Sequence, residues 1–506
     1  MPAVSVAARV SAPASARARE RLRAWWPLAA LVLLAAALRL ATLDLQSFWY
    51  DEAFTPVRVL HTSVGATLRS VVHTENSPPL WYLIAWLDAR LLGDGELALR
   101  LPSALAGIAT VGVAWAIGQE LAGRRCAVVT AALVALNPLF VWYSQEARVY
   151  ALFALSAAVA MLCCVRARRE PTRGRMAAFA LAGALALLTH YFAVFLLLGM
   201  VLWLLGDRAS RRAALGASAV LALVGLALLP LILAQGGHGT QWIGRWALSS
   251  RLAAIPQYYL TGYSGAPLGH GIELLIALPL LAGLALGAPR IAGSRAASAV
   301  AGAAPITATG VLVPLALAGM GADYLAPRNL LGAMIPLTAL AAIVLSAPAA
   351  PHAAAALAAA AAVGFLAVSV DVNLSPRLQR GDWRGVARSL RSGSPARALT
   401  TVELGAAPLE YYLPGLRKLA RGASVNVDEI DETGYAPLRS SAGRAPAPGF
   451  SLSHRADVHG LIVYRFLAPV RRSVSERTLR GHVITLAHPE VLVGAGAHVT
   501  SAPARG

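Results

Sequence analysis

The feature that most constrains this chain is a series of apolar blocks, most of them about as long as a bilayer is thick. A transmembrane helix needs about 20 mainly apolar residues, and such blocks recur from residue 26 to residue 370. Over the whole chain 57% of the residues are hydrophobic and 14% are charged. This composition is typical of a polytopic membrane protein and excludes an ordinary soluble enzyme. We therefore predict a mostly α-helical membrane domain over residues 25–370.

The excess positive charge is concentrated in short segments between the apolar blocks. The formal net charge is +19, which alone would also suit a nucleic-acid-binding protein. Arg clusters beside membrane spans, however, mark the cytoplasmic side of a membrane protein, so we exclude nucleic acid as a partner. Residues 1–24 carry five Arg among Ala, Ser and Pro and are predicted to form a disordered cytoplasmic tail.

With every Arg cluster placed in the cytoplasm, the chain is predicted to cross the membrane about eleven times. The first span runs from about Trp26 to Leu43. A cleaved signal peptide is the alternative, but this apolar run is longer than a signal-peptide core of roughly 7 to 15 residues. Residues 79–93 are too short and too polar to cross, and we interpret them as an interfacial helix in the first outer loop. Residues 176–205 must cross twice, turning near His190.

This map predicts the orientation and the location of the chain. The N-terminus lies in the cytoplasm, and the C-terminus and the polar loops lie outside. Lys418 is the only Lys, while Arg, Ala and Gly are abundant, a bias typical of a GC-rich bacterial genome. We therefore predict a multi-pass protein of a bacterial plasma membrane, with the bilayer as its surroundings.

Two adjacent carboxylates follow the first span. Asp51 and Glu52 come directly after Trp49 and Tyr50, aromatic residues of the kind that settle at the headgroup level. Carboxylates lose solvation there and are kept where something binds or balances them. A solvated loop after a helix is the alternative interpretation. A divalent cation held by the pair, helped by acidic residues of later loops, is another, so the metal stays unknown at this point.

Ordered motifs between residues 26 and 370 carry a resemblance to a known family. They are residues 48–53 (FWYDEA) after the first span, 76–80 (NSPPL) at the start of the interfacial helix, 100–103 (RLPS) before the second span, 143–150 (YSQEARVY) and, more weakly, 328–331 (RNLL) with Pro336. In this order the chain resembles the GT-C superfamily of polyprenyl-phosphate-dependent membrane glycosyltransferases, in particular the bacterial protein-mannosyltransferase-like and Rgt-type enzymes. Residues 371–506 lie outside the resemblance.

The resemblance implies a reaction and places its acidic residue at Asp51. A sugar would move from a polyprenyl phosphate to an extracytoplasmic acceptor, which is a glycolipid, a cell-wall glycan or a protein, with inversion at the anomeric carbon. Physical chemistry agrees with this position, because a carboxylate can accept the proton of an attacking hydroxyl group. Glu52 is the second catalytic candidate. No cofactor is required by this chemistry, and a divalent cation remains an open alternative.

The leaving phosphate needs a cation, and the planar fork of Arg suits phosphate. Arg328 is the first choice, because it follows Pro327 at the predicted outer mouth of a span. The alternatives are Arg148, Arg100 and Arg39. An interface anchor, a helix-end salt bridge or, for Arg39, snorkelling to the headgroups would explain each alternative equally well.

The outer loops supply further candidates for substrate binding. Their His side chains can donate to sugar or phosphate oxygens, and their aromatic rings can stack on sugar faces, although aromatic residues of a membrane interface need no such role. The set is His73, Glu75, Tyr143, Gln145, Glu146, His190, Tyr191 and Tyr324.

The hydropathy falls after Asp371, and residues 371–506 are predicted to form a small extracytoplasmic α/β domain. Residues 382–390 have a helical pattern and residues 461–467 the pattern of a strand. Two other functions compete with a transferase. A transporter or lipid flippase would favour broken helices and midplane charges, and a non-catalytic scaffold would leave Asp51 and Glu52 without a role. Because the charges lie at the outer mouths of the spans, we favour the transferase.

Overall fold

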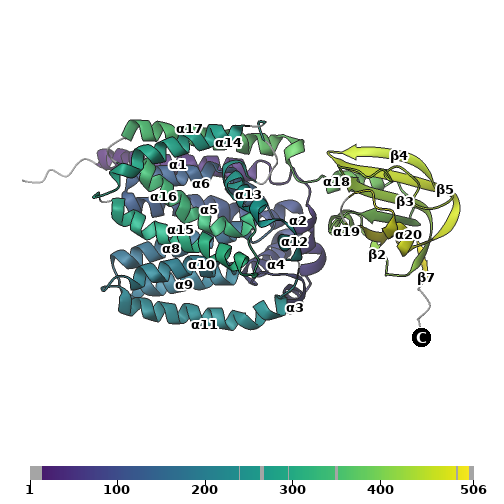
Figure 1. Ribbon diagram of the computed structural model, residues 1–506, viewed down its shortest axis with the longest axis horizontal. Helices are drawn as coiled ribbons and strands as arrows, with labels where there is room; N and C mark the ends of the chain where they lie inside the picture. Colours follow the sequence, from purple (N-terminus) through teal and green to yellow (C-terminus); the bar gives the residue numbers. More distant parts are fainter. Residues whose placement is uncertain are drawn as a thin grey trace, which may run out of the picture.

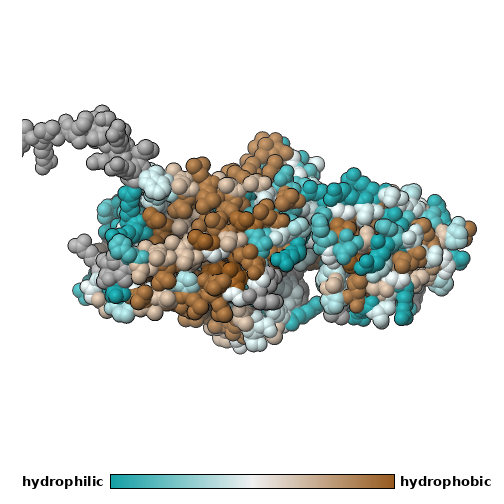
Figure 2. Space-filling view, turned by 90° about the horizontal axis from the view of Figure 1, so that it is seen from above, coloured by the Kyte–Doolittle hydropathy of each residue, from teal (hydrophilic) through white to brown (hydrophobic). Residues whose placement is uncertain are grey.

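The computed structural model describes residues 14–238, 240–262, 267–269, 271–294, 296–347, 351–485 and 488–500. A long helical bundle is followed by a smaller sheet domain at one of its ends (Figure 1). Hydrophobic residues dominate the side of the bundle, whereas the sheet domain is more hydrophilic (Figure 2). The predicted class, a mostly helical membrane protein with a small C-terminal domain of sheet and helices, is confirmed.

Seven helical segments in the described residues are long and apolar enough to cross a membrane. They are α5 (Glu96–Ala122), α8 (Tyr150–Arg169), α11 (Arg211–Gln235), α14 (Ile272–Gly287) with η2 (Ala288–Arg290), α15 (Ala296–Gly319), η3 (Pro327–Ala333) with α16 (Met334–Leu345), and α17 (Pro351–Leu374). The bent pair α6 (Arg124–Leu136) and α7 (Pro138–Ser144) is an eighth candidate.

Three shorter helices fall on the remaining predicted spans. The apolar part of α1 covers Trp25–Leu40, α10 covers Ala193–Leu205, and α9 covers Arg173–Thr189. The break between α9 and α10 falls at residues 190–192, where a turn was predicted. The helices thus coincide with the predicted segments, while the number and direction of the crossings stay predictions.

The ends of two predicted segments differ from the structure. Helix α1 (Ala14–Leu40) begins well before the first span, so residues 14–24 are helical and not disordered, because Ala, Arg, Leu and Glu favour helix. Residues 1–13 lie outside the described residues. The segment 128–143 is bent by 57° between α6 and α7, because Asn137 caps a new helix and Pro138 cannot continue the old one.

Short helices make up the segment that was predicted to be the first outer loop. They are α2 (Tyr50–Phe54), the π-helix η1 (Thr55–Val59), α3 (Val64–Thr74) and α4 (Leu80–Leu92). Helix α4 has 13 residues and is not among the candidate spans, in agreement with its interpretation as an interfacial helix. The later loop between α11 and α14 adds α12 (Gln241–Arg245) and α13 (Leu248–Thr261).

The C-terminal domain is built on a mixed sheet with strand order β2-β6-β1-β3-β5-β4, and β7 pairs with β3. Strands β1 and β3 are parallel and the other pairs are antiparallel. The strands are β1 (Arg397–Thr401), β2 (Arg417–Lys418), β3 (Ser424–Tyr435), β4 (Ser451–Val458), β5 (Leu461–Ser475), β6 (Glu490–Val493) and β7 (His498–Thr500). Its helices are α18 (Trp383–Leu390), α19 (Ala406–Tyr412) and α20 (Glu476–Gly481). The predicted helix 382–390 and strand 461–467 are confirmed as α18 and part of β5.

The C-terminal domain packs directly on the first outer loop. The backbone amide of Phe48 donates to the hydroxyl of Tyr412 on α19 at 2.7 Å, and that hydroxyl lies 2.6 Å from a carboxylate oxygen of Glu96. Trp49 is buried in the same hydrophobic cluster as Trp383 of α18. The loop that carries Asp51 and Glu52 is therefore held between the bundle and the C-terminal domain.

Candidate active site

The two adjacent carboxylates of the first outer loop have different partners. Asp51 and Glu52 lie in the first turn of α2, where neighbouring side chains project in different directions. One oxygen of Asp51 accepts a 2.8 Å hydrogen bond from Arg328, and the two side chains are 19% and 21% exposed. Glu52 is fully buried. Water therefore reaches Asp51 and does not reach Glu52.

Glu52 forms a buried ion pair with Arg100. Its two carboxylate oxygens each accept a 2.7 Å hydrogen bond from Arg100, and one also accepts from the backbone amide of Ala147 at 2.9 Å. Burial alone would raise the pKa of Glu52, but Arg100 and the amide hold it below its ordinary value. Arg100 also donates to three backbone carbonyl groups of residues 43–47. These bonds occupy both side chains, so the geometry disfavours the predicted catalytic role of Glu52 and the predicted phosphate contact of Arg100.

Arg328 is held by a carboxylate and by aromatic rings. It follows Pro327 in the first turn of η3, and the fixed ring of Pro327 suits the start of a helix. The guanidinium carbon lies 5.6 Å from the ring centre of Tyr150 and 5.0 Å from that of Trp242, which are cation–π distances. The planar cation is thus positioned beside Asp51 where water can reach both.

A second Arg–carboxylate pair lies next to this site. Arg148 donates to Glu75 at 3.0 Å, and the hydroxyl of Tyr82 donates to the same oxygen of Glu75 at 2.5 Å. The side chain of Arg148 is 12% exposed, and its Nε has no hydrogen-bond partner among the described residues. The Nε–H group of Arg148 is therefore left without an acceptor in the described part of the chain, whereas Glu75 already accepts hydrogen bonds from Arg148 and Tyr82.

Glu146 joins the site to the linker that precedes the C-terminal domain. One of its oxygens accepts a 3.0 Å hydrogen bond from Arg380, whose guanidinium lies 3.9 Å from the ring centre of Trp142. The other oxygen has no hydrogen-bond partner among the described residues. Glu146 and Arg380 are both buried, so this pair anchors the linker and does not face the acceptor.

Arg39 and Gln145 hold the first helix in the bundle. Arg39 is fully buried, and its nearest acceptors are the hydroxyl of Ser144 at 3.1 Å and the carbonyl of Ala135 at 2.9 Å. Gln145 donates to the carbonyl of Leu38 at 3.1 Å. Neither side chain is accessible to a substrate. Burial therefore disfavours the predicted phosphate contact of Arg39 and the predicted substrate contact of Gln145.

The aromatic and His candidates divide into two groups. Tyr143 and Tyr150 have ring centres 4.8 Å apart, and His190 stacks on Phe153 at 4.5 Å. These rings form the buried wall behind Arg328. The hydroxyl of Tyr191, in contrast, donates to Gln235 at 2.7 Å.

The remaining two candidates lie outside this wall. His73 is in the last turn of α3. Tyr324 is 49% exposed and lies on the loop that precedes η3. A direct substrate contact stays a prediction for both residues.

The geometry disfavours a metal held by the two adjacent carboxylates. Both carboxylate oxygens of Glu52 already accept hydrogen bonds from Arg100 and Ala147. Glu52 therefore cannot ligate a cation together with Asp51 unless its buried ion pair with Arg100 breaks. Among the described residues no group of three or more His, Cys, Asp or Glu side chains could hold a metal ion. The site is better suited to an anion, because Arg328 and Arg148 both border it.

Sequence reasoning missed three residues that shape this site: Trp242, Arg380 and Tyr412. Trp242 lies in a long polar loop, and the other two follow the last span. Arg380 bonds to a residue 234 positions earlier, a distance over which no local pattern carries a signal. The only local signal for Arg380 was the high content of Arg and Trp in residues 380–384.

Comparisons with known proteins agree with the fold. A family model described as dolichyl-phosphate-mannose-protein mannosyltransferase matches residues 76–234. The crystal structure of ArnT from Cupriavidus metallidurans bound to undecaprenyl phosphate aligns with 87% of this chain and 98% of its own, with a TM-score of 0.55 and 13% identity. The chain is thus similar to this family over residues 76–234, and its fold is similar to that of ArnT. The apo structure of the same ArnT covers 89% of the chain and 98% of its own, with a TM-score of 0.52 and 13% identity.

The match to the family model covers only part of the chain, and the similarity to ArnT concerns the fold. Comparison with curated proteins gives no match. The segment matched by the family model contains Arg148 and His190 but neither Asp51 nor Arg328. The roles of the latter two in this protein therefore rest on their geometry.

Proposed function

We propose that this protein is a glycosyltransferase of the GT-C type, which transfers a sugar from a polyprenyl-phosphate donor to an extracytoplasmic acceptor with inversion at the anomeric carbon. The observation that carries the proposal is the pair formed by Asp51 and Arg328, a carboxylate and a guanidinium 2.8 Å apart and both open to water. Two neighbouring Arg–carboxylate pairs, Glu52 with Arg100 and Glu146 with Arg380, are closed to water.

In the proposed reaction Asp51 is the general base. The acceptor hydroxyl oxygen attacks the anomeric carbon, its proton passes to Asp51, and the bond between that carbon and the phosphate oxygen breaks. The phosphate leaves with the bonding electrons and gains negative charge. Attack and departure on opposite faces in one displacement give inversion.

Arg328 is proposed to bind the leaving phosphate, with Arg148 as the second cation. The guanidinium fork suits phosphate oxygens and stabilises the charge that grows on them. The bound donor would draw Arg328 from Asp51 toward the phosphate, which leaves Asp51 free to accept a proton. The crystal structure of ArnT bound to undecaprenyl phosphate, similar in fold, supports a lipid-phosphate donor.

The acceptor class is proposed to be a glycolipid, a cell-wall glycan or a protein. Mass spectrometry of membrane glycolipids, wall glycans and secreted proteins from a deletion strain should show one product that lacks a sugar. Purified protein in liposomes, given that product and a polyprenyl-phosphate sugar, should restore it, with the anomeric configuration measured by NMR. Identical profiles in the deletion and parent strains would contradict the proposal, and retention in the product would contradict inversion.

A further inference from the structure

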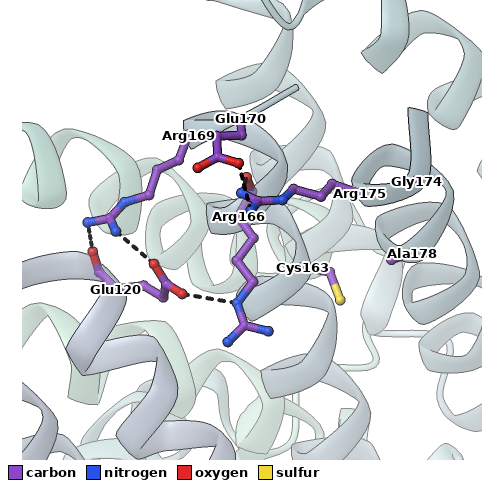
Figure 3. A pocket seen from close by; sticks show the side chains of 8 residues that line it. All are labelled: Glu120, Cys163, Arg166, Arg169, Glu170, Gly174, Arg175 and Ala178. Atoms are coloured by element: carbon purple, nitrogen blue, oxygen red, sulfur yellow. Dashed lines mark hydrogen bonds and ion pairs between the residues drawn. The ribbon is translucent and has the colours of Figure 1, made fainter. Parts of the chain in front are cut away.

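A basic cavity lies at the end of the bundle opposite to the candidate active site. Its volume is about 570 Å³, and it is lined by Glu120, Cys163, Arg166, Arg169, Glu170, Gly174, Arg175 and Ala178 (Figure 3). Helix α5 carries Arg100 at the active site and Glu120 at this cavity. Twenty residues of α-helix span about 30 Å, so one membrane thickness separates the two sites and this cavity has no part in the proposed transfer.

The charges around the cavity are partly balanced. Glu120 accepts from Nε of Arg166 at 3.0 Å and from Nη1 of Arg169 at 2.7 Å. Arg175 pairs with Glu170 at 2.8 Å and donates to the carbonyl of Arg166 at 3.0 Å. Three Arg against two Glu leave one positive charge at this site.

Arg166 is the side chain with spare donors. Its Nε is fixed by Glu120, whereas its two terminal nitrogens have no hydrogen-bond partner in the part of the chain that the structure describes. The side chain is 48% exposed. Figure 3 shows these nitrogens directed away from Glu120. A guanidinium held at one nitrogen and open at the other two is pre-organised for a second anion, and its fork suits phosphate.

An apolar stripe leads away from the cavity along α9. Gly174, Ala178, Leu181 and Leu185 follow one another at helical spacing on one face. All four are exposed, and the two Leu side chains are 63% and 41% exposed. A free anion would make no favourable contact with this apolar stripe, whereas an acyl chain would pack against it.

We propose that this cavity binds the phosphate headgroup of an anionic membrane lipid, with an acyl chain of that lipid along the stripe on α9. The predicted topology places this end of the bundle in the cytoplasm, so the lipid belongs to the inner leaflet. Basic pockets between transmembrane helices on that side are suited to such headgroups. The proposal is independent of the transfer reaction.

Gly174 offers a test that leaves every charge in place. It lies in the first turn of α9, and a Cβ atom added to it would meet no atom within 4 Å. Gly174→Leu should therefore fold normally and place a side chain in the cavity. Gly216→Leu is the matched control, since Gly216 lies near the start of α11, does not line the cavity and has equally open space around it.

The experiment is native mass spectrometry of delipidated full-length protein titrated with phosphatidylglycerol or phosphatidylcholine of the same chains. The wild type and Gly216→Leu should retain phosphatidylglycerol preferentially, and Gly174→Leu should lose that preference. Arg166→Gln, which removes a charge-assisted hydrogen bond, should weaken retention about tenfold or more. Equal thermal midpoints would show that the variants are folded.

Three results would overturn the proposal. The first is equal retention of the two lipids by the wild type. The second is the same lipid preference in Gly174→Leu, Arg166→Gln and the control. The third is displacement of phosphatidylglycerol by millimolar inorganic phosphate, which would assign the cavity to a free anion. Loss of sugar transfer is not among these results, so a failed transfer mechanism and a failed lipid site remain distinguishable.

Discussion

Asp51 accepts a 2.8 Å hydrogen bond from Arg328, which lies 277 positions later in the chain. The first outer loop and the start of η3 are thereby joined at one point. The two side chains proposed to act on the acceptor proton and the leaving phosphate are partners of each other in this state. A change in either residue therefore alters the surroundings of the other, and the two must be tested separately.

The first prediction concerns the general base. Asp51→Asn keeps the shape of the side chain and loses its basicity, so sugar transfer by reconstituted protein should fall about 10²- to 10⁴-fold. Donor binding should be largely retained, because Arg328 and Arg148 are unchanged. Transfer is followed by mass spectrometry of the glycosylated acceptor. Full activity in Asp51→Asn would remove the assignment of this residue.

Glu52→Gln is the matched comparison for Asp51→Asn. Because Glu52 neutralises Arg100 inside the protein, breaking this buried pair should cost about 3–5 kcal/mol of stability. Its thermal midpoint should fall, and its activity should fall less than that of Asp51→Asn once equal amounts of folded protein are compared. A chelator should leave the wild type active. If Asp51→Asn and Glu52→Gln were both inactive and a chelator abolished the activity of the wild type, the result would instead indicate a metal site.

The second prediction concerns recognition of the donor phosphate. Arg328→Lys keeps a positive charge near Asp51 but loses the bidentate fork, and an ammonium stacks differently against Tyr150 and Trp242. Transfer should drop well below the wild-type rate while the protein still inserts and folds. The measurement is the initial rate at several donor concentrations. If the turnover of Arg328→Lys were near normal, the phosphate contact would instead be assigned to Arg148, whose Nε has no hydrogen-bond partner among the described residues.

The third prediction concerns topology. An odd number of spans, with a cytoplasmic N-terminus, puts the C-terminal domain outside. A reporter that is active only in the cytoplasm should be silent when fused after Gly506, and the same reporter inserted in the Arg-rich loop between α8 and α9 should be active. The two fusions control each other for expression. An active C-terminal fusion would require an even number of spans.

The fourth prediction concerns pH and the C-terminal domain. The side chains of His482 and Glu432 are 2.7 Å apart. The hydrogen bond that His482 donates to Glu432 raises the pKa of His482 against the opposing effect of burial. Burial raises the pKa of Glu432, against the opposing effect of His482. Both groups bind protons more tightly in the folded state, so the stability that they contribute is lost as the pH rises.

For His482 this loss begins near its ordinary pKa of 6.5 and is complete above its raised value. The thermal midpoint of the full-length protein should therefore fall as the pH rises from about 6.5. His482→Gln should remove this part of the fall. His454→Gln, at an exposed position of β4, should behave as the wild type does. A wild-type midpoint that rises over the same range would contradict the assignment.

The sequence by itself determined the class of this protein. Apolar blocks of bilayer length and Arg clusters between them depend only on local composition, so they predicted the helices, the break at residues 190–192 and the interfacial helix near residues 80–92. The motif after the first span likewise drew attention to Asp51. These signals are readable because each is contained in one short segment.

The tertiary structure alone decided which charged residues are paired and which are open to water. Asp51 and Glu52 are neighbours in the sequence, yet one faces Arg328 at an accessible site and the other is buried against Arg100. Arg39 was an alternative to Arg328 in the sequence, and the structure buries it. Pairing depends on contacts between segments hundreds of positions apart and on the burial that they create, and the energy of a charge depends on that burial. No local sequence pattern contains information on these long-range contacts or on the burial of the charged side chains.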